Sequence, residues 1–371
     1  MLNMNKHYVV TIVILFIGLA CIPGIQAHEN QNPMQQSSHP NSEGNTIYVN
    51  DDNMQGPWDG SIEHPYQYIQ DGIDKARNND TVFVFRGTYT ENLKIRLKSI
   101  ELIGEDKEET IIQGTVALNF SRLTTVTGFT IQQKDTPSLS TVSIMFSSRC
   151  TITGNIVMNH QNTNCIVIFF SSHCDIKGNT IKHTNYEPSD PAILAQFCAH
   201  INISGNTMDN HGIGIGLMFV HSHIIYNNII TNSGDSIILF FARKNLIYKN
   251  VIQNGIYGID IWAGSYSNKI IANSITDMRV GIVTEKGQSN NHFYYNNFER
   301  NIKHAWGEDI NFWYKSEGFF HGKGNYWDDY TGVDADGDGI GDTPYNISGG
   351  NNKDRYPLME PIDIENIVIK L

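Results

Sequence analysis

The middle of the chain repeats one short pattern of apolar and polar positions. An apolar residue is followed three positions later by Asn, and a second apolar residue stands two positions after that Asn. The copies are Ile152-Asn155-Val157, Ile176-Asn179-Ile181, Ile203-Asn206-Met208, Ile225-Asn228-Ile230, Ile247-Asn250-Ile252, Ile270-Asn273-Ile275 and Phe293-Asn296-Phe298. Successive Asn residues are 24, 27, 22, 22, 23 and 23 positions apart. A nearly fixed period of this length is typical of a solenoid.

The composition of the repeat favours strands over helices. Short β-branched runs alternate with Asn and Gly, and no segment here has the longer 3.6-residue period of a helical repeat. The sequence therefore predicts an all-β fold, a single-stranded right-handed parallel β-helix with about 22 residues per coil. Asn tolerates the left-handed backbone of a sharp corner, and stacked Asn amides bond one another, so the Asn column is interpreted as structural.

Two further columns follow the same register. Five Phe residues lie nine positions before a ladder Asn and predict an inward aromatic stack: Phe146, Phe170, Phe197, Phe219 and Phe241. Because alternate strand residues point to opposite faces, the preceding positions are predicted to point outward. This apolar stripe comprises Met145, Phe169, Gln196, Met218, Phe240 and Trp262, with Val167, Leu194 and Ile238.

The stripe has two alternative interpretations, because large exposed apolar patches are unusual on a secreted monomer. A loop or the C-terminal tail covers it, or it forms a docking or sugar-stacking surface. The tail has apolar residues for the first alternative: Ile362, Ile364, Ile367, Ile369 and Leu371. For the second, the candidate ligand-binding residues are Met145, Phe169, Met218, Phe240, Trp262 and Asp260.

Both ends of a solenoid must be closed. Residues 66–77 predict a short amphipathic capping helix with Ile69, Ile73 and Ala76 inward, followed by strands at 81–85 and 87–89. Aromatic residues after Phe298 predict a C-terminal plug: Trp306, Trp313, Tyr314, Phe319, Phe320, Tyr326 and Trp327. We therefore divide the chain into a β-helix with its N-terminal cap (46–300) and a C-terminal cap (301–371).

The first residues of the chain predict a targeting signal rather than part of the fold. Lys6 precedes an apolar run that ends before Pro23, and residues 1–27 are interpreted as a signal peptide. Residues 28–45 are polar and are interpreted as a flexible linker. No later segment is apolar enough to span a membrane, so the mature chain is predicted to be extracellular, at the cell surface or periplasmic.

The charge composition of the chain limits the classes of partner that it could bind. Charged residues make up 17% of the chain, and the net charge is −12. This charge disfavours nucleic acid as a partner.

The segment from Asp334 to Asp342 predicts a calcium loop. Asp334, Asp336, Asp338 and Asp342 occupy positions 1, 3, 5 and 9 of an EF-hand-like loop, with Gly339 at position 6. Ile340 is counted among the candidate ligands. Tyr345 replaces the bidentate Glu at position 12, so further oxygens are sought from Asp328, Asp329 or Asp354. The alternative is a solvated acidic turn without a metal ion.

Motifs at both ends of the mature chain indicate a family. They are Ile47-Tyr48-Val49-Asn50, Gly56-Pro57-Trp58 and Gly87-Thr88-Tyr89 at the start, and residues 324–330, 339–345 and 355–359 at the end. With the Asn repeats, they resemble the NosD-like right-handed β-helix family. The resemblance implies the β-helix fold. Some members are implicated in delivering copper to nitrous oxide reductase outside the membrane, and others are surface, sugar-binding or sugar-cleaving proteins.

Copper would need convergent His, Met or Cys ligands. The candidates are His211, Met218, His221 and His223 in one coil, His173 and His200 at similar corners, and His28 as a mature N-terminus. His221 and His223 share a strand side if that strand is regular.

Sugar chemistry is a third option. Residues 257–260 faintly resemble an epimerase motif, and the candidate groove residues are Asp260, Arg243, Lys244, Glu285 and Lys286. Among the thiols, Cys150 and Cys174 share a repeat position, which predicts neighbours on adjacent coils, bridged or as free thiols.

The sequence favours a non-catalytic, exported protein that binds carbohydrate or a protein partner. Copper handling with nitrous oxide reductase as client is the runner-up, and a polysaccharide lyase or epimerase is third.

Overall fold

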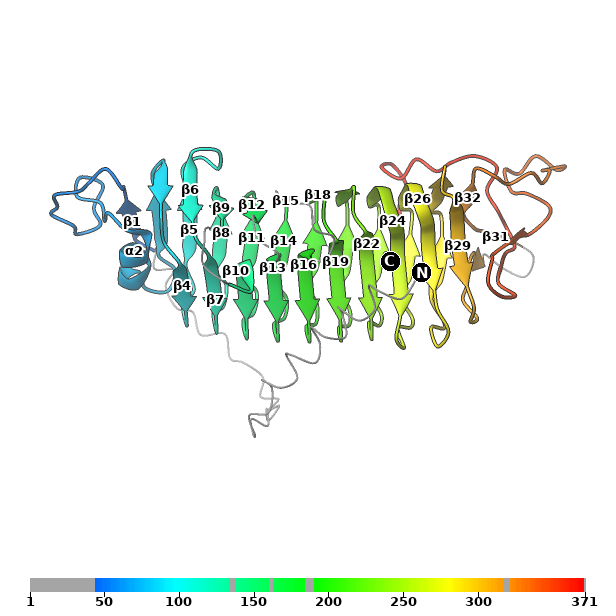
Figure 1. Ribbon diagram of the computed structural model, residues 1–371, viewed down its shortest axis with the longest axis horizontal. Helices are drawn as coiled ribbons and strands as arrows, with labels where there is room; N and C mark the ends of the chain where they lie inside the picture. The colour runs from blue at the N-terminus through cyan, green and yellow to red at the C-terminus, as the bar shows by residue number, and fades with distance from the viewer. Residues whose placement is uncertain (1–43, 134–137, 160–162, 184–189, 317–320, 370–371) are drawn as a thin grey trace, which may run out of the picture. The chain divides into compact units, whose positions relative to one another are not determined.

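Short β-strands stacked in parallel coils make up nearly all of the described chain (Figure 1). The computed structural model describes residues 44–133, 138–159, 163–183, 190–316 and 321–369. The predicted signal peptide, the linker up to residue 43, His28, Phe319, Phe320 and Leu371 lie outside these residues. About nine turns of a right-handed parallel β-helix are present, which confirms the predicted fold class.

The strands form two long parallel sheets. The first sheet contains β1 (Thr46–Val49), β2 (Thr81–Val84), β5 (Glu101–Gly104), β8 (Thr125–Thr127), β11 (Thr151–Thr153), β14 (Asp175–Lys177), β17 (Asn202–Ser204), β20 (Ile224–Tyr226), β23 (Leu246–Tyr248), β25 (Lys269–Ile271) and β27 (His292–Tyr294).

The second sheet collects the remaining strands of every coil. It contains β3 (Gly87–Tyr89), β4 (Leu93–Arg96), β6 (Thr110–Gln113), β7 (Val116–Asn119), β9 (Thr130–Gln132), β10 (Ser140–Met145), β12 (Ile156–Asn159), β13 (Asn164–Phe169), β15 (Thr180–His183), β16 (Pro191–Gln196), β18 (Thr207–Asp209), β19 (Ile213–Met218), β21 (Ile229–Thr231), β22 (Asp235–Phe240), β24 (Val251–Trp262), β26 (Ser274–Thr284), β28 (Asn297–Glu299), β29 (Lys303–Gly307) and β32 (Tyr326–Trp327). Two short antiparallel pairs follow, β30 (Lys315–Ser316) with β31 (Gly322–Lys323), and β33 (Tyr345–Asn346) with β34 (Lys353–Asp354).

The Asn column forms a buried hydrogen-bonded ladder, as predicted. In each step the side-chain Oδ1 of one Asn accepts from both the backbone N–H and the Nδ2 of the Asn one coil earlier. Between Asn250 and Asn273 these distances are 3.0 and 2.9 Å. The ladder continues past the seven repeats to Asn325 and ends on the carboxylate of Asp354.

The predicted backbone role of the ladder Asn is wrong. The left-handed residue at each corner is the one before the ladder Asn, for example Gly178 (φ 62°), Asn227 (φ 54°) and Lys249 (φ 55°). The ladder Asn itself points inward. The residue before each ladder Asn thus adopts the left-handed backbone of the corner. The side-chain amide of the ladder Asn bonds the neighbouring coil.

The predicted inward Phe stack is also wrong, although its register is right. Phe146, Phe170 and Phe241 are 48%, 42% and 49% exposed. Each Phe comes directly after a strand and has a positive φ. This backbone turns its ring outward and brings the side chain of the next residue inward. The rings form an external ladder with Phe120 at its start, with centroid distances of 4.9 to 5.6 Å: Phe120, Phe146, Phe170, Phe197, Phe219 and Phe241.

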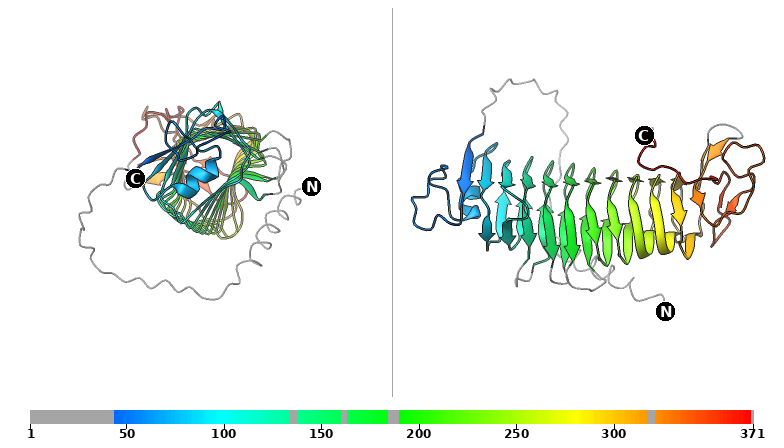
Figure 2. Two further views of the ribbon diagram at one scale, coloured as in Figure 1. Left: turned by 90° about the vertical axis from the view of Figure 1, so that its left-hand side faces the viewer. Right: turned by 90° about the horizontal axis from the view of Figure 1, so that it is seen from above.

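The helix α2 (Ile69–Lys75) lies across the first coil (Figure 2, left). Ile69, Ile73 and the following Ala76 are buried, as predicted. The helix is shorter than the predicted range because charged side chains close both ends. The Glu91 carboxylate accepts from the N–H groups of the first turn at 2.8 and 3.0 Å. Lys98 Nζ donates to three carbonyls of the last turn at 2.6 to 3.0 Å. Both charges complement the helix dipole.

At the other end, aromatic rings stack beyond the last repeat. Trp327 stacks on Phe298 at 4.4 Å and on Tyr345 at 4.3 Å, and Trp313 stacks on Phe293 at 4.3 Å. Both tryptophans are fully buried. No helix in the described part of the chain is long and apolar enough to cross a membrane.

Candidate functional site

The predicted apolar stripe exists as a column on consecutive coils. Strand pairing aligns Met145, Phe169, Gln196, Met218, Phe240 and Trp262 in one register. Their strand neighbours Ile168, Leu217 and Leu239 belong to the core, so the predicted inside–outside phase is correct. Met218, Phe240 and Trp262 are nevertheless buried, at 1%, 8% and 8% exposure. A sugar-binding role for this column stays a prediction.

The C-terminal tail does not follow the stripe. Asn297 fixes the start of the tail through two hydrogen bonds with the backbone of Ile362, at 2.8 and 2.9 Å. Lys249 Nζ donates to the carbonyl of Glu365 at 2.8 Å. These contacts hold the tail beside the corner after β27. The alternative in which the tail covers the stripe is therefore wrong.

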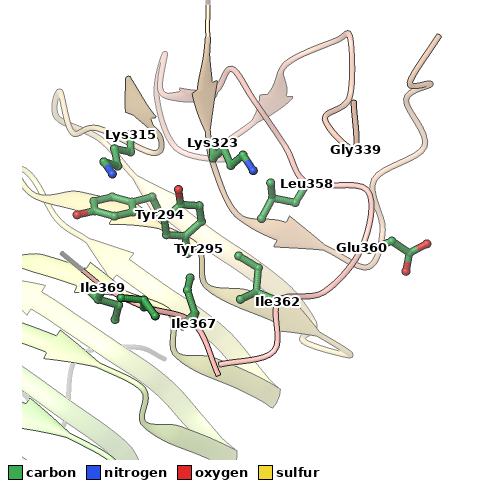
Figure 3. Close-up of a pocket in the computed structure, with 11 residues that line it drawn as sticks. Tyr294, Tyr295, Lys315, Lys323, Gly339, Leu358, Glu360, Ile362, Ile367 and Ile369 are labelled. Carbon is green, nitrogen blue, oxygen red and sulfur yellow. The ribbon is translucent and has the colours of Figure 1, made fainter. Parts of the chain in front are cut away.

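A cavity of about 490 Å³ lies between the tail and this corner (Figure 3). Tyr294 and Tyr295 form one wall, and Ile362 and Ile367 form another. Lys315, Lys323 and Glu360 also line it. The lining combines aromatic, aliphatic and charged groups. Sequence reasoning missed this cavity because it considered the tail only as one possible cover for the stripe.

The acidic loop is partly arranged as predicted. Asp334, Asp336 and Asp338 bring one carboxylate oxygen each within 4.8 Å of one another. Asp334 also accepts backbone N–H groups from Gly337 and Gly339 at 2.8 and 2.9 Å, and these bonds lower its pKa.

The fourth predicted acid ligand, Asp342, does not belong to this group of three. The carboxylate of Asp342 accepts from the N–H of Ala335 at 2.8 Å, and the backbone N–H of Ile340 donates to Asp338. A calcium site at this loop stays a prediction.

The extra oxygens sought for this loop are elsewhere. Asp354 is fully buried and accepts from Asn325, Trp327 and Tyr356. Asp328 and Asp329 face His304. The suggestion that one of these three carboxylates completes the calcium loop is wrong, because the end of the Asn ladder and the His304 imidazole occupy them.

His304 and the two carboxylates form a cluster that sequence reasoning missed. His304 Nε2 lies 2.8 Å from Asp328 and 3.3 Å from Asp329, and its side chain is only 3% exposed. Asn325 and Trp327 repeat the spacing of Asn296 and Phe298, so the ladder pattern places Asp328 one coil above Glu299. That spacing was the available signal.

The hydrogen bonds of this cluster decide its chemistry. Asn301 Oδ1 accepts from the N–H of Met278 at 2.9 Å, so its Nδ2 faces His304 Nδ1 at 3.1 Å. Nδ1 is therefore the acceptor, and Nε2 carries the proton that the aspartates share. A metal ion on Nε2 would move that proton to Nδ1, against the Asn301 amide. The cluster as folded fits a histidine–carboxylate pair better than a copper site.

None of the other candidate histidines in the described residues belongs to a cluster that could hold a metal ion. The rings of His173, His200 and His221 do stack along one corner, as described below. Burial lowers the pKa of His211 and His223 to about 4, and each ring bonds a backbone carbonyl. His221 is half-buried and lies on the outside, whereas His223 points inward, because Ser222 between them has a φ of 60°. The expectation that the two imidazoles share one side is wrong.

The four cysteines within the described residues, Cys150, Cys165, Cys174 and Cys198, are free and buried. Cys150 and Cys174 lie on adjacent, paired coils and share a hydrogen bond, which confirms their register as unbridged neighbours. Burial raises the pKa of Cys198 to about 12. A thiol whose pKa is raised in this way is a poor copper ligand, since metal binding requires the thiolate.

The corner that precedes the first sheet carries a run of basic residues. Parallel bridges connect its first positions: Arg122, Ser148, Ser172, Ala199, His221 and Arg243. Each following residue has a positive φ of 55 to 60°: Leu123, Arg149, His173, His200, Ser222 and Lys244. We call the charged and imidazole members the basic corner: Arg122, Arg149, His173, His200, His221, Arg243 and Lys244. All but the half-buried His221 are exposed.

Electrostatics agree with this clustering. The rings of His173 and His200 stack at 4.8 Å, and His221 follows at 5.8 Å. Burial lowers the pKa of His221, and the positive charges of Arg243, the imidazole of His200 and Lys244 lower it further. The basic corner is therefore one continuous surface over six consecutive coils.

The residues proposed for sugar chemistry are divided between regions. Asp260 is half-buried in the strand, paired between Ile238 and Val283. Arg243 and Lys244 lie at the basic corner. Glu285 and Lys286 follow the end of β26. The structure thus separates Asp260 from the positive groups at the corner.

Comparison with known proteins identifies a resemblance over part of the chain. Residues 182–332 match the family model described as "Periplasmic copper-binding protein (NosD)". The "Probable ABC transporter binding protein NosD" of Pseudomonas aeruginosa is 34% identical over 100 residues, which cover 26% of this chain and 22% of that protein. The match thus spans less than a quarter of the curated relative.

Solved structures share the fold. The complex of XylC with xylose aligns with a TM-score of 0.55 at 11% identity, covering 73% of this chain and 70% of that one. The alginate lyase of Paenibacillus sp. str. FPU-7 aligns with a TM-score of 0.48 at 10% identity, covering 66% and 96%. Identities this low show the fold alone. The resemblance to NosD-like right-handed β-helix proteins, which the end motifs predicted, is therefore confirmed.

Proposed function

We propose that this protein is an exported, non-catalytic NosD-like β-helix protein that binds an extended carbohydrate along its coils. The observation that supports this is the basic corner, which stays in register over six consecutive coils and is exposed on five of them. A surface that repeats once per coil matches a ligand that repeats along its own length.

The spacing supports a polymer rather than a compact ligand. Stacked side chains at the corner and in the Phe ladder are about 5 Å apart, the separation of neighbouring strands. This is comparable to the length of one pyranose unit in an extended glycan. Each coil would then meet a successive sugar unit, and weak contacts would add along the track.

A glycan array tests the proposal. The mature chain should bind glycans of six or more units better than the corresponding disaccharides, because long chains contact more coils. An array in which no extended glycan is bound would refute it, and would leave a protein partner as the remaining form of non-catalytic binding.

Copper handling is the second candidate, and the family match over residues 182–332 favours it. In this candidate the client would be nitrous oxide reductase. The imidazole and carboxylates of the His304 cluster are donors that suit Cu²⁺, but their hydrogen bonds oppose metal binding as described. Cu²⁺ titration followed by electron paramagnetic resonance should therefore show no signal that is lost in His304→Gln. A nitrogen-ligated signal lost in that variant, but kept in Asp336→Asn, would establish copper binding there.

A lyase or epimerase activity is the third alternative. The separation of Asp260 from Arg243 and Lys244 weighs against it. Incubation with uronate polymers should leave the ultraviolet absorbance of unsaturated products at baseline.

A further inference from the structure

We propose that the extended ligand of the basic corner is a linear anionic polysaccharide that carries a carboxylate on most of its sugar units. This inference rests on the proposed carbohydrate binding and names the class of glycan. It follows from the charge of the corner, from the neighbouring Phe ladder and from the kinds of contact that the surface leaves free.

The charge of the corner is opposite to that of the whole chain. The chain has a net charge of −12. The twelve described residues at the two outward positions of this corner, from Arg122 to Lys244, nevertheless include no Asp or Glu. One carboxylate, Asp175, lies two residues beyond His173 at the start of β14. The cationic residues are Arg122 and Arg149 on the first two coils and Arg243 and Lys244 on the sixth, and the three coils between them present the imidazoles of His173, His200 and His221. Positive groups on a negative protein attract polyanions locally, while the remaining surface repels them. The ligand is therefore held along one line.

The Phe ladder runs beside this track. Each Phe lies three positions before a residue of the second corner column, as Phe170 does before His173. Its rings lie nearly parallel, within 5 to 10° of each other, so their faces cover one another and their edges face solvent. Ring edges are electropositive. The ladder thus extends a surface that suits carboxylate oxygens.

The same geometry argues against nucleic acid. Single-stranded nucleic acid binding relies on aromatic faces on which bases stack. Here the faces inside the ladder are occupied by neighbouring rings, and Arg96 lies over the first ring, Phe120, at 5.8 Å. A neutral glycan would leave the positive groups without partners. A polyuronate satisfies the charges and needs no stacking face.

The experiment measures binding of alginate oligomers by isothermal titration calorimetry at low and high salt. The test variant is Arg149→Ser/Lys244→Ser, because Ser222 occupies the same left-handed position in the same column. The matched control is Lys177→Ser/Lys182→Thr, which also removes two positive charges. Ser204 and Thr231 stand in the same columns as these lysines, so both variants copy residues that the coils already accept.

We expect the test variant to bind alginate about tenfold more weakly at low salt, and the control to bind as the wild type does. High salt should weaken wild-type binding and reduce the difference between the proteins. Asp175→Asn should strengthen binding, because it removes a negative charge beside the corner. The coil should accept this residue, since Asn202 stands at the same position one coil later.

Three results would overturn the inference. They are equal losses in the test and control variants, neutral dextran bound as tightly as alginate, or oligothymidylate bound as tightly as alginate. If neutral extended glycans bind and the test variant has no effect, carbohydrate binding survives and the anionic class fails. If no extended glycan binds, both proposals fail.

Discussion

The Asn ladder predicts a large cost for a single buried substitution, Asn250→Ala. Asn250 donates from Nδ2 to the carbonyls of Ile225 and Tyr248 and to Asn273 Oδ1, at 3.0, 3.1 and 2.9 Å. Its Oδ1 accepts from the N–H and Nδ2 of Asn228 at 3.0 and 2.9 Å. Alanine removes all of these bonds from a fully buried position.

The magnitude follows from the groups that lose a partner. The backbone N–H of Asn228 loses its acceptor, and the carbonyl of Ile225 loses this donor. Asn228 Nδ2 keeps its bonds to the carbonyls of coil residues Ile203 and Tyr226, so it adds little. With about 1 to 3 kcal/mol for each buried group left unpaired, we expect the free energy of unfolding to fall by about 3 kcal/mol.

Urea unfolding followed by tryptophan fluorescence measures this loss. The control is Gln253→Ala on the same strand, because Gln253 is exposed and should cost less than about 0.5 kcal/mol. Solenoids can unfold in parts, so a matching loss should appear in amide hydrogen exchange of the coils around Asn250. If Asn250→Ala costs no more than Gln253→Ala, the ladder does not stabilise the coils as argued.

The other predictions concern the C-terminal region. Burial raises the pKa of Asp354 to about 7 despite its hydrogen-bond donors, so the folded protein holds a proton that the unfolded chain has released. Stability from this group is therefore present below about pH 4 and is lost as pH rises to about 7, and Asp354→Asn should flatten the melting temperature between pH 5 and 8. A variant whose profile stays parallel to that of the wild type would contradict this. If the acidic loop binds calcium, millimolar Ca²⁺ should raise the melting temperature of the wild type but not of Asp334→Asn/Asp336→Asn. An unchanged wild-type melting temperature from chelator to millimolar Ca²⁺ would refute calcium binding.

Much of the fold could be predicted because the repeat is imposed by the core. Inward Ile and Asn must recur wherever coils stack, so their spacing is visible in the sequence. The helix α2 could be located from its apolar face, but its ends could not. Glu91 and Lys98 close it from coils that come later in the chain, and no local pattern announces such caps.

The Phe column shows where alternation fails. Met145 points outward, so strict alternation places Phe146 inward. The rule holds only in extended backbone, and Phe146 has a φ of 52°. Ser147 takes the inward position instead, and its backbone N–H donates to Ser171 Oγ at 3.0 Å. The small residues after each Phe were the available signal.

The candidate sites were harder to predict because their residues are distant in the sequence. His304 meets Asp328 across a coil whose length departs from the repeat, since Asn325 follows Asn296 by 29 positions. The tail cavity depends on two hydrogen bonds between Asn297 and Ile362. The spacing of Asn325 and Trp327 places Asp328 on its coil, but no periodic pattern in the sequence places His304 or Ile362 beside its partner.

The basic corner differs from these sites because the fold does not require its chemistry. Each corner has three positions, two that face outward and a third that points into the core. The third is restricted to residues that pack or bond inside, such as Cys174, His223 and Asn268. Packing does not restrict the residue type at the two outward positions. Tyr266 and Ser267 occupy them on a later coil, which shows that the same corner forms without charge. Packing therefore does not explain why positive charge accumulates from Arg122 to Lys244. A charge run that the fold permits but does not need is the part of this surface where binding is best sought.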